Sequence, residues 1–493
     1  MDSVHADDTT YGHSGGSVSS ANGVGPLTPP VASSRVPAAR IPRELRAYRT
    51  WALARRLPGG VRDDEFIDLV QRIEDGLRHR CPPVRLFVDG EEAFHDVVHW
   101  LHEAREEILV ETYILRDDRI GTVVKEALAA AAGRGVRVCV LADAVGSLAT
   151  KDTFWTALEA DGVTLRLFHR LRHVPLQALR RDHRKIIVID RNVAFTGGMN
   201  IGEEYGSSIR KQNENAWRDT FMRVEGSVAR ELAAVFAEGW DRADGPPLPG
   251  LEYVSWSENT GVPLQDSRRA RGARAIRARI ERQLGLRRDR RRGRRVRRNG
   301  DVWNASEPDS AGTVLVLDSR PGRGQRETLA VMSALVGGAR ERLWITTPYF
   351  APPSRALTLL AGAAKRGVDV RLLLPGPRTD VPFIRHAAHG AYGLMLAAGV
   401  RVFEYQRATL HSKSVVVDGY ASIVGSTNLD FRSFWLNAEC NLLMFDTQFG
   451  TELETAFLYD CGGSEEITRD AWRQRGFGHR LLDRTARALR FAL

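Results

Sequence analysis

The sequence predicts an α/β protein that contains two copies of one domain. Strand and helix signals alternate from about residue 83, and the same succession returns about 230 residues later. A short pattern, His-x-Lys-x4-Asp, occurs once in each copy, with the two histidines 228 positions apart. A repeat distance of this size indicates duplication of a whole domain rather than a solenoid of short repeats.

The first copy begins with an apolar strand at 84–90 and an amphipathic helix at 91–107. A strand follows at 108–115, then a helix at 123–135 that ends in glycine, and a buried strand at 136–143. Three segments of the second copy match segments of the first: 346–350 matches 111–115, 363–376 matches 131–143, and 395–405 matches 157–168.

Length and composition are those of a globular chain. The 493 residues are enough for two or three domains, and 43% hydrophobic with 27% charged residues is an ordinary balance. Because no run approaches eighteen apolar residues, we expect no transmembrane helix. The N-terminal residues also lack the basic and apolar regions of a secretory signal. We therefore expect any membrane contact to be peripheral.

The cysteines are scattered, with no Cys-x-x-Cys pair and no nearby cluster of histidine and cysteine. This pattern argues against a disulfide framework and against a zinc site. We expect reduced thiols in a cytoplasmic setting, and the four residues concerned are Cys81, Cys139, Cys440 and Cys461.

The positive charge is concentrated in residues 268–298, which contain sixteen arginines and two acidic residues, while the whole chain has a net charge of +10. This segment carries +14, which leaves about −4 for the rest of the chain. Three interpretations stay open: adhesion to anionic lipid, a solvated linker, and binding of nucleic-acid phosphates. We favour adhesion to lipid, because the segment has no aromatic residue on which single-stranded bases could stack.

These features divide the chain into five parts. We expect a disordered tail, a first domain preceded by a basic helix, an Arg-rich linker, a second domain and a basic amphipathic tail, at residues 1–40, 41–250, 251–309, 310–462 and 463–493. The basic helix within 41–58 and the helix of the C-terminal tail each allow two interpretations. Each packs on a domain, or each lies on a membrane surface.

The candidate site residues come from the two motifs. They are His183, Lys185 and Asp190 in the first copy, His411, Lys413 and Asp418 in the second, and the carboxamides Asn200 and Asn428, each seventeen residues after its histidine. Alternation along a strand places each histidine and lysine on one face. Each aspartate falls on the opposite face, so we expect it to brace the structure rather than to touch a substrate.

A pair of histidines with two lysines and two carboxamides suits cleavage of a phosphodiester without a metal. One imidazole attacks phosphorus and the other protonates the departing alkoxide. The cations and carboxamides hold the non-bridging oxygens as charge concentrates there.

The chain resembles the phospholipase D superfamily over roughly residues 83–462, and within it the bacterial cardiolipin synthases without membrane-spanning helices. The segments that carry this likeness are GGMNIGEEY (197–205), WRDT (217–220), TTPYF (346–350), FEY (403–405), GSTNLDFRS (425–433) and LNAE (436–439). The resemblance implies two phospholipase D-like α-β-α sandwich domains with mixed central sheets and an active site at their interface.

The resemblance also implies roles. His183 is expected as the nucleophile and His411 as the acid and base, while Ser426 either donates to phosphate or forms a turn. A carboxylate about thirty residues after each histidine is expected to orient it. Glu439 fits His411. Asp219 fits His183, with Glu214 as the alternative.

Other histidines have simpler interpretations. His386 and His389, three apart on an expected helix, could bind a metal, but we favour a surface or pocket-rim position for both. His169 and His173 are expected to line the mouth of the site rather than to react.

The expected reaction is transfer of a phosphatidyl group between two phosphatidylglycerol molecules, which gives cardiolipin and glycerol without a metal or an organic cofactor. The expected partners are phosphatidylglycerol and other anionic phospholipids at the membrane surface, on the cytoplasmic face of the inner membrane, and not nucleic acid. The alternatives are hydrolysis to phosphatidic acid, a nuclease or phosphodiesterase of the same superfamily, and a lipid-binding module without activity. The oligomeric state stays open.

Overall fold

The computed structural model describes residues 46–74, 76–168, 180–208, 216–251, 312–321 and 325–488. All of them belong to one of the two units into which the chain divides, Pro42–Leu493. The tail expected at 1–40 and the arginine segment 268–298 lie outside the described residues. Within the described ranges, no helix has both the length and the apolar character needed to cross a bilayer.

A seven-stranded mixed sheet forms the first half. Its strands, in spatial order, are β2 (Arg85–Phe87), β9 (Phe221–Glu225), β7 (Val193–Gly197), β6 (Ile186–Ile189), β3 (Glu107–Thr112), β4 (Arg137–Asp143) and β5 (Thr164–Phe168). The last three run parallel, while β6 joins β3 antiparallel. Strand β3 is buried at every position, as expected where helices cover both faces of a sheet.

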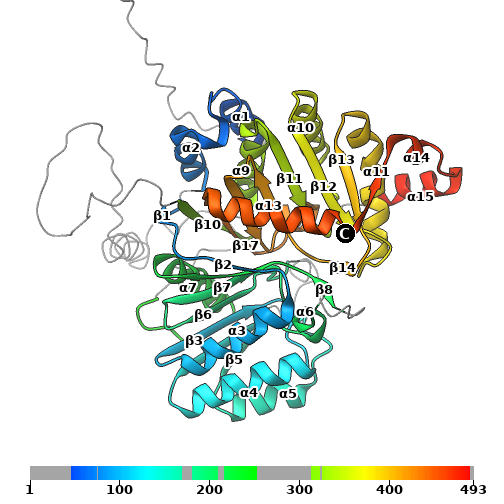
Figure 1. The fold of residues 1–493 in the computed structure, drawn as a ribbon. Coiled ribbons are helices and arrows are strands. Elements are labelled where there is room, and N and C mark those ends of the chain that lie inside the picture. The colour runs from blue at the N-terminus through cyan, green and yellow to red at the C-terminus, as the bar shows by residue number, and fades with distance from the viewer. Residues whose placement is uncertain are drawn as a thin grey trace, which may run out of the picture. The chain divides into compact units, whose positions relative to one another are not determined.

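Helices cover both faces of this sheet. They are α3 (Gly90–Glu103), α4 (Arg119–Gly133) and α5 (Asp152–Ala160) on one face and α7 (Ser227–Arg242) on the other, with the short α6 (Glu203–Gly206) near the sheet edge. Asp89 and Asp118 accept hydrogen bonds from the first-turn backbone of α3 and α4, which explains where both helices begin. The first half is therefore an α-β-α sandwich (Figure 1).

A nine-stranded mixed sheet forms the second half. Its strands, in spatial order, are β1 (His79–Arg80), β10 (Thr313–Ser319), β17 (Glu439–Phe445), β16 (Ala421–Gly425), β15 (Ser414–Val417), β11 (Arg342–Thr346), β12 (Asp369–Pro375), β13 (Arg401–Tyr405) and β18 (Ser464–Ile467). The covering helices are α9 (Gln325–Gly338), α10 (Ser354–Lys365), α11 (Pro382–Ala397) and, on the other face, α13 (Thr447–Cys461).

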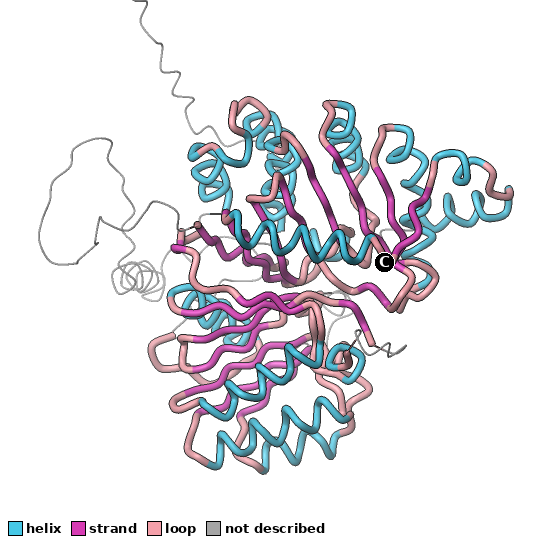
Figure 2. Tube along the Cα trace, viewed as in Figure 1, coloured by secondary structure: helices cyan, strands magenta, loops and turns pink. Residues whose placement is uncertain are grey.

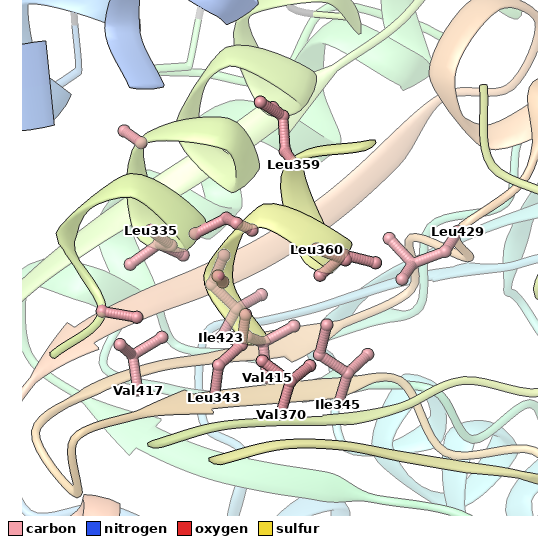
Figure 3. Close-up of a cluster of buried hydrophobic side chains, with 14 of the residues drawn as sticks. Leu335, Leu343, Ile345, Leu359, Leu360, Val370, Val415, Val417, Ile423 and Leu429 are labelled. Carbon is pink, nitrogen blue, oxygen red and sulfur yellow. The ribbon is translucent and has the colours of Figure 1, made fainter. Parts of the chain in front are cut away.

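Among the described residues, three large hydrophobic cores hold these layers together, and a small fourth cluster contains Ala351, Ala387 and Ala486. One fills the outer side of each half, and Figure 3 shows part of the second, where Leu335 of α9 and Leu360 of α10 pack over Val415 and Ile345 of the sheet. The third core lies between the two sheets, around α7 and α13, and includes residues of both. Figure 2 shows the strands in two groups, each flanked by helices. The predicted fold class, two α-β-α sandwich domains with mixed sheets, is confirmed.

Two short crossings join the halves beside the third core. Strand β8 (Trp217–Arg218) of the first half pairs in parallel with β14 (Thr409–Leu410) of the second, which Figure 1 shows at the right between the two sheets. Asp182 of the first half forms an isolated parallel bridge with Ala438 of the second. Each crossing involves the residues directly before one motif histidine.

The N-terminal helices pack on the second half and not on the first. Helix α1 (Arg46–Ala54) lies against α9, where Thr50 Oγ1 donates to the carbonyl of Ala330 at 3.1 Å. The 3-10 turn η2 (Gly60–Arg62) and α2 (Asp64–Glu74) share its core, and β1 pairs with β10. The basic helix expected to precede the first domain therefore contacts the second, because its apolar face completes the core over α9.

The C-terminal elements also belong to the second half. Strand β18 pairs with β13 at the sheet edge, and α15 (Phe477–Ala488) packs on α11, with α14 (Arg469–Arg473) between them in sequence. Of the two interpretations left open for the tail, packing therefore describes the inner side of α15. Its Leu482 remains 45% exposed.

Candidate functional site

The two motif histidines lie at the ends of the two crossings and face one cavity. The backbone N–H of His183 donates to the carbonyl of Ala438 at 2.9 Å, and that of His411 donates to the carbonyl of Arg218 at 2.8 Å. Each histidine is thus anchored by backbone of the other half. The cavity has a volume of about 160 Å³, and its lining residues are Tyr113, Ile114, Arg181, His183, Asn200, Tyr205, Trp217, Tyr349, Asp380, Ile384, His411, Asn428, Asp430, Arg432 and Asn437.

The carboxylates that contact the histidines are exchanged between the halves. His183 Nδ1 lies 2.9 Å from Glu439 Oε2, and His411 Nδ1 lies 2.6 Å from Asp219 Oδ2. The expected pairing of Asp219 with His183 and of Glu439 with His411 is therefore wrong. The cause is the pair of crossings, because Asp219 directly follows β8 and Glu439 directly follows Ala438.

Glu439 is held by several donors. Its Oε2 accepts from Ser426 Oγ at 2.5 Å and its Oε1 accepts from Ser433 Oγ at 2.7 Å. Burial alone would raise the pKa of Glu439, but the charge and hydrogen bond of His183, the charge of Lys185 and the Ser426 bond together lower it. Ser426, expected either to donate to phosphate or to form a turn, instead uses its hydroxyl to fix this carboxylate.

Asp219 depends on a glycine. Its Oδ1 accepts from the backbone N–H of Thr220 at 2.7 Å. A Cβ at Gly198 would lie 2.1 Å from Oδ1, so only glycine fits beside this carboxylate. Ser426 occupies the equivalent place in the second copy, so the difference between GGMN and GSTN reflects two ways of supporting a carboxylate.

Burial lowers the pKa of both motif histidines, which favours the neutral imidazole in each. Burial lowers the pKa of His183 to about 4, against the opposing charge of Glu439. Burial and then the charge of Lys413 lower the pKa of His411, while Asp219 opposes both. In each case a carboxylate accepts from Nδ1, which fixes the tautomer. This leaves the Nε2 lone pair of His183 available, while Nε2 of His411 lies 3.0 Å from Lys413 Nζ.

Each motif lysine contacts the backbone of the histidine two residues before it. Lys185 Nζ donates to the carbonyl of His183 at 2.6 Å. Lys413 Nζ donates to the carbonyl of His411 and lies 2.8 Å from Nδ1 and 3.0 Å from Nε2 of its ring. Burial lowers the pKa of Lys185 to about 7 and that of Lys413 to about 8. A bound anion would favour the charged form of both amines.

Both carboxamides line the cavity with unused hydrogen-bonding capacity. Asn200 Oδ1 accepts from the backbone N–H of Ile114 at 3.2 Å, while its Nδ2 has no partner among the described residues. The side-chain Oδ1 of Asn428 is likewise buried without a partner within the described ranges. Buried polar groups without partners are costly, so these atoms fit a site that a polar ligand completes.

The motif aspartates lie on the other side of the strands, as their alternation predicts. Asp190 accepts from the backbone N–H groups of Arg105, Glu106 and Glu107 at 2.8–2.9 Å. Asp418 accepts in the same way from three successive residues, 340–342. Neither aspartate is among the cavity-lining residues, so both brace the start of a neighbouring strand.

Several charged residues at the site were not assigned a role from the sequence. Arg184, between the motif histidine and lysine, is fully buried and forms ion pairs with Glu111 and with Asp318 of the second half. Arg218 forms a buried ion pair with Asp460 at 2.7 Å across the same boundary. The sequence offered one signal for these two arginines: Arg184 directly follows His183, and Arg218 directly precedes Asp219.

The aromatic residues around the cavity also went unassigned. Tyr113 packs against His183 with ring centroids 5.1 Å apart, and Tyr349 packs against His411 at 6.4 Å. Tyr205 and Trp217 lie 5.4 and 5.2 Å from His411. These residues belong to segments that the sequence analysis had singled out as repeated or as typical of the family. That analysis gave them no chemical role.

One group within the described residues has a spacing that suits a metal ion. The ligand atoms of His386, His389 and Asp483 all lie within 4.8 Å of one another. Asp483 is already paired with Arg475 at 2.6 Å, and His389 Nε2 lies 2.9 Å from Glu404. These protein groups already provide polar partners for the cluster without a metal ion. The other residues considered for the mouth or as partners, His169, His173 and Glu214, lie outside the described residues.

The cysteines play no part in this geometry. All four are free thiols, and burial raises the pKa of Cys81, Cys139 and Cys461 to about 12 and that of Cys440 well above its ordinary value. Thiols of this kind are unreactive.

The chain is similar to several known proteins. A family model described as a cardiolipin synthase, phospholipase D-like domain matches residues 97–240 and 332–461. Cardiolipin synthase 2 of Bacillus cereus is 31% identical over 407 residues, which cover 82% of this chain and 70% of the relative. Cardiolipin synthase of Geobacillus thermodenitrificans is 32% identical over 436 residues, which cover 88% and 77%.

A solved structure shares the fold. Phosphatidylserine synthase of Haemophilus influenzae superposes with a TM-score of 0.59 and 16% identity, and the match covers 87% of this chain and all of that one. The family match, together with relatives at about this identity over most of their length, shows that the chain belongs to the phospholipase D-like cardiolipin synthase family and is an enzyme of that kind.

Proposed function

We propose that the protein transfers a phosphatidyl group from one phosphatidylglycerol molecule to the terminal hydroxyl of another, giving cardiolipin and glycerol through a phosphohistidine on His183. The observation that carries the proposal is the pair of histidines at one cavity, each with Nδ1 on a carboxylate of the opposite half. The names of the relatives support the substrate class.

In the first step, Nε2 of His183 attacks the phosphorus of the donor. A bond forms between nitrogen and phosphorus, and the bond from phosphorus to the glycerol oxygen breaks. The departing oxygen takes the proton of His411 Nε2. His411 must therefore be charged at this point, and the negative charge of a bound phosphodiester opposes the burial that lowers its pKa.

In the second step, the terminal hydroxyl of the acceptor attacks the phosphohistidine. Its proton passes to Nε2 of His411, the nitrogen–phosphorus bond breaks, and His183 returns to its neutral form. Lys185, Lys413, Asn200 and Asn428 stabilise the charge on the non-bridging oxygens in both steps.

The surroundings of the two rings favour His183 as the nucleophile. Lys413 Nζ lies 3.0 Å from Nε2 of His411, where it would compete for an attacking lone pair. Lys185 instead donates to the backbone carbonyl of His183. With a pKa of about 4, His183 also keeps a free lone pair throughout the neutral range.

The membrane surface is part of the proposal. Phosphatidylglycerol is an anionic bilayer lipid, so the enzyme would work as a peripheral protein at the cytoplasmic face. Tyr48 and Leu53 of α1 are 57% and 42% exposed, although the helix packs on α9 with its other side. They are candidates for contact with lipid beside the basic residues of that helix.

The test is product analysis by mass spectrometry after incubation of the purified protein with phosphatidylglycerol vesicles in the presence of EDTA. Cardiolipin and glycerol in equal amounts would support the proposal. Phosphatidic acid alone would make the enzyme a hydrolase, and no lipid product would direct attention to nucleic-acid phosphodiesters.

The matched variants are His183→Ala and His411→Ala, assayed for a covalent phosphoryl adduct after acid-free quenching. His183→Ala should form no adduct. An adduct on His411 in the wild-type protein would overturn the assignment of the nucleophile.

A further inference from the structure

The cavity carries charges of both signs, which a site for an anion alone does not explain. Its lining includes Arg181 and Arg432, and two carboxylates, Asp380 and Asp430. Arginines suit a phosphodiester. Carboxylates facing the same space would repel one, so they need another ligand or another role.

Asp430 has a structural role of its own. Its Oδ1 accepts from the backbone N–H of Ser433 at 2.8 Å and begins the short helix α12 (Phe431–Trp435). Burial raises the pKa of Asp430 to about 7, so it is partly neutral at physiological pH. The carboxylate that remains unexplained is Asp380.

Asp380 lies at the exposed rim of the cavity, in the loop between β12 and α11. It accepts a hydrogen bond from the hydroxyl of Tyr349, whose ring packs edge-on to His411 with centroids 6.4 Å apart. The charge of Asp380 also acts on His411 and Lys413, where it favours the protonated forms. The pair therefore lies on the His411 side of the cavity.

The opposite side is basic. Tyr113, one residue before the position that matches Tyr349, packs on His183, and its pKa is raised by burial and by Asp143, while Arg432 and Arg181 oppose this. Asp143, the last residue of the equivalent strand β4, is fully buried and paired with Arg181 at 3.4 Å. The two copies have therefore diverged, so that a rim carboxylate is present beside His411 and a paired one beside His183.

A neutral polyol fits the His411 side. Hydroxyl groups donate well to a carboxylate, and a tyrosine hydroxyl can both donate and accept. We propose that Asp380 and Tyr349 form a subsite that binds the hydroxyls of the acceptor's glycerol headgroup beside His411. The subsite holds the hydroxyl next to the one that attacks, so it selects a vicinal diol over water or a simple alcohol. This inference rests on the proposed function.

The readout is the choice between two soluble acceptors that differ by one hydroxyl. Phosphatidylglycerol vesicles supply the phosphatidyl group, and 1,2-propanediol and 1-propanol compete at equal concentration. Mass spectrometry gives the ratio of the two phosphatidyl alcohols, which reports on the acceptor step and not on the donor step. The burst of glycerol released in the first turnover is measured in parallel.

We expect the wild-type enzyme to favour the diol by about tenfold or more. This is the loss expected for 1-propanol, which lacks the hydroxyl that would donate a hydrogen bond to the charged Asp380. Asp380→Asn and Tyr349→Phe should bring the ratio close to one, because both alcohols compete for the same phosphohistidine. The glycerol burst of Asp380→Asn should slow, because His411 loses a charge that favours its protonated form. Asp380→Glu should restore part of the preference. Asp161→Asn, at an exposed carboxylate at the end of α5, is the matched control and should behave as wild type.

A ratio that stays high in Asp380→Asn, with cardiolipin still formed, would overturn the subsite alone. A wild-type ratio close to one would also overturn it, because the pair would then not discriminate the second hydroxyl of the acceptor. A wild-type enzyme that forms neither cardiolipin nor phosphatidyl alcohols would overturn the proposed function itself.

Discussion

Nδ1 of His183 and Oε2 of Glu439 are 256 residues apart in the chain and 2.9 Å apart in space. The second pair, His411 and Asp219, is separated by 192 residues and 2.6 Å. Each imidazole therefore receives its orienting carboxylate from the other half of the protein. Neither half alone contains a motif histidine together with the carboxylate that contacts its Nδ1.

The exchanged pairing predicts opposite effects of two carboxamide substitutions. With bis(p-nitrophenyl) phosphate the leaving group needs no proton, so only the nucleophile limits the first step. Glu439→Gln should slow the burst of p-nitrophenol by about 10²-fold or more, because His183 loses the charge that orients it. Asp219→Asn should leave the burst nearly unchanged and slow turnover of phosphatidylglycerol. Stopped-flow absorbance gives the burst of p-nitrophenol, and mass spectrometry of cardiolipin gives the turnover of phosphatidylglycerol. The reverse pattern would contradict the exchange.

Gly198→Ala should reproduce the effect of Asp219→Asn, although the substitution itself removes no charge. The new Cβ would lie 2.1 Å from Asp219 Oδ1 and would push the carboxylate away from His411. We expect slower turnover of phosphatidylglycerol and a normal p-nitrophenol burst. Gly133→Ala is the matched control, because a Cβ there meets no atom within 4 Å. Equal activity of both variants would show that Asp219 does not need this space.

Folding stability should fall as the pH drops from about 6.5 to about 4. The folded pKa of His183 is about 4 and its ordinary value is 6.5, so the unfolded chain binds more protons in this window. A shift of this size corresponds to about 3 kcal/mol, and the lowered pKa of Glu439 acts in the same direction. Urea unfolding at pH 7 and pH 4.5 should show a smaller loss for His183→Asn than for the wild type. Identical losses would rule out this source of pH dependence.

Asp190→Asn and Asp418→Asn should weaken folding more than chemistry. Each carboxylate accepts from three backbone N–H groups, and a carboxamide of the same size cannot accept as strongly. We expect each variant to lose about 1–3 kcal/mol of unfolding free energy. Both positions have a positive φ, 48° and 53°, which asparagine tolerates, so backbone strain does not confuse the comparison. A normal stability with a lost burst would show that these aspartates act on the substrate.

The sequence was informative where chemistry repeats at a fixed spacing. The two motifs, the carboxamides seventeen residues further on and the matched strands predicted a duplicated α/β fold, and the side of the strand for Asp190 and Asp418 followed from simple alternation. The family resemblance also implied Asp219 and Glu439 as candidates. It could not find their partners, because these depend on which backbone segments meet across the boundary.

Other features depend on tertiary contacts that leave no local trace. Helix α1 has a basic amphipathic pattern, which does not reveal whether its apolar side meets the first half, the second half or a lipid. Asp380 follows a strand in a loop of ordinary composition, and only its hydrogen bond with Tyr349 connects it to the site. The role of Ser426 was missed because a serine in a turn has many possible acceptors.

The crossings of β8 with β14 and of Asp182 with Ala438 make the protein resemble a strand-exchanged dimer whose two subunits have been fused. Loss of the carboxylate in one half therefore disables the histidine of the other half, because each motif histidine takes its carboxylate from across the boundary. Two chains with different inactivating substitutions could complement each other only if the first half of one chain packed on the second half of the other. Fusion thus secures a one-to-one supply of both half-sites and frees each copy to specialise, one toward the phosphate and the other toward the alcohol.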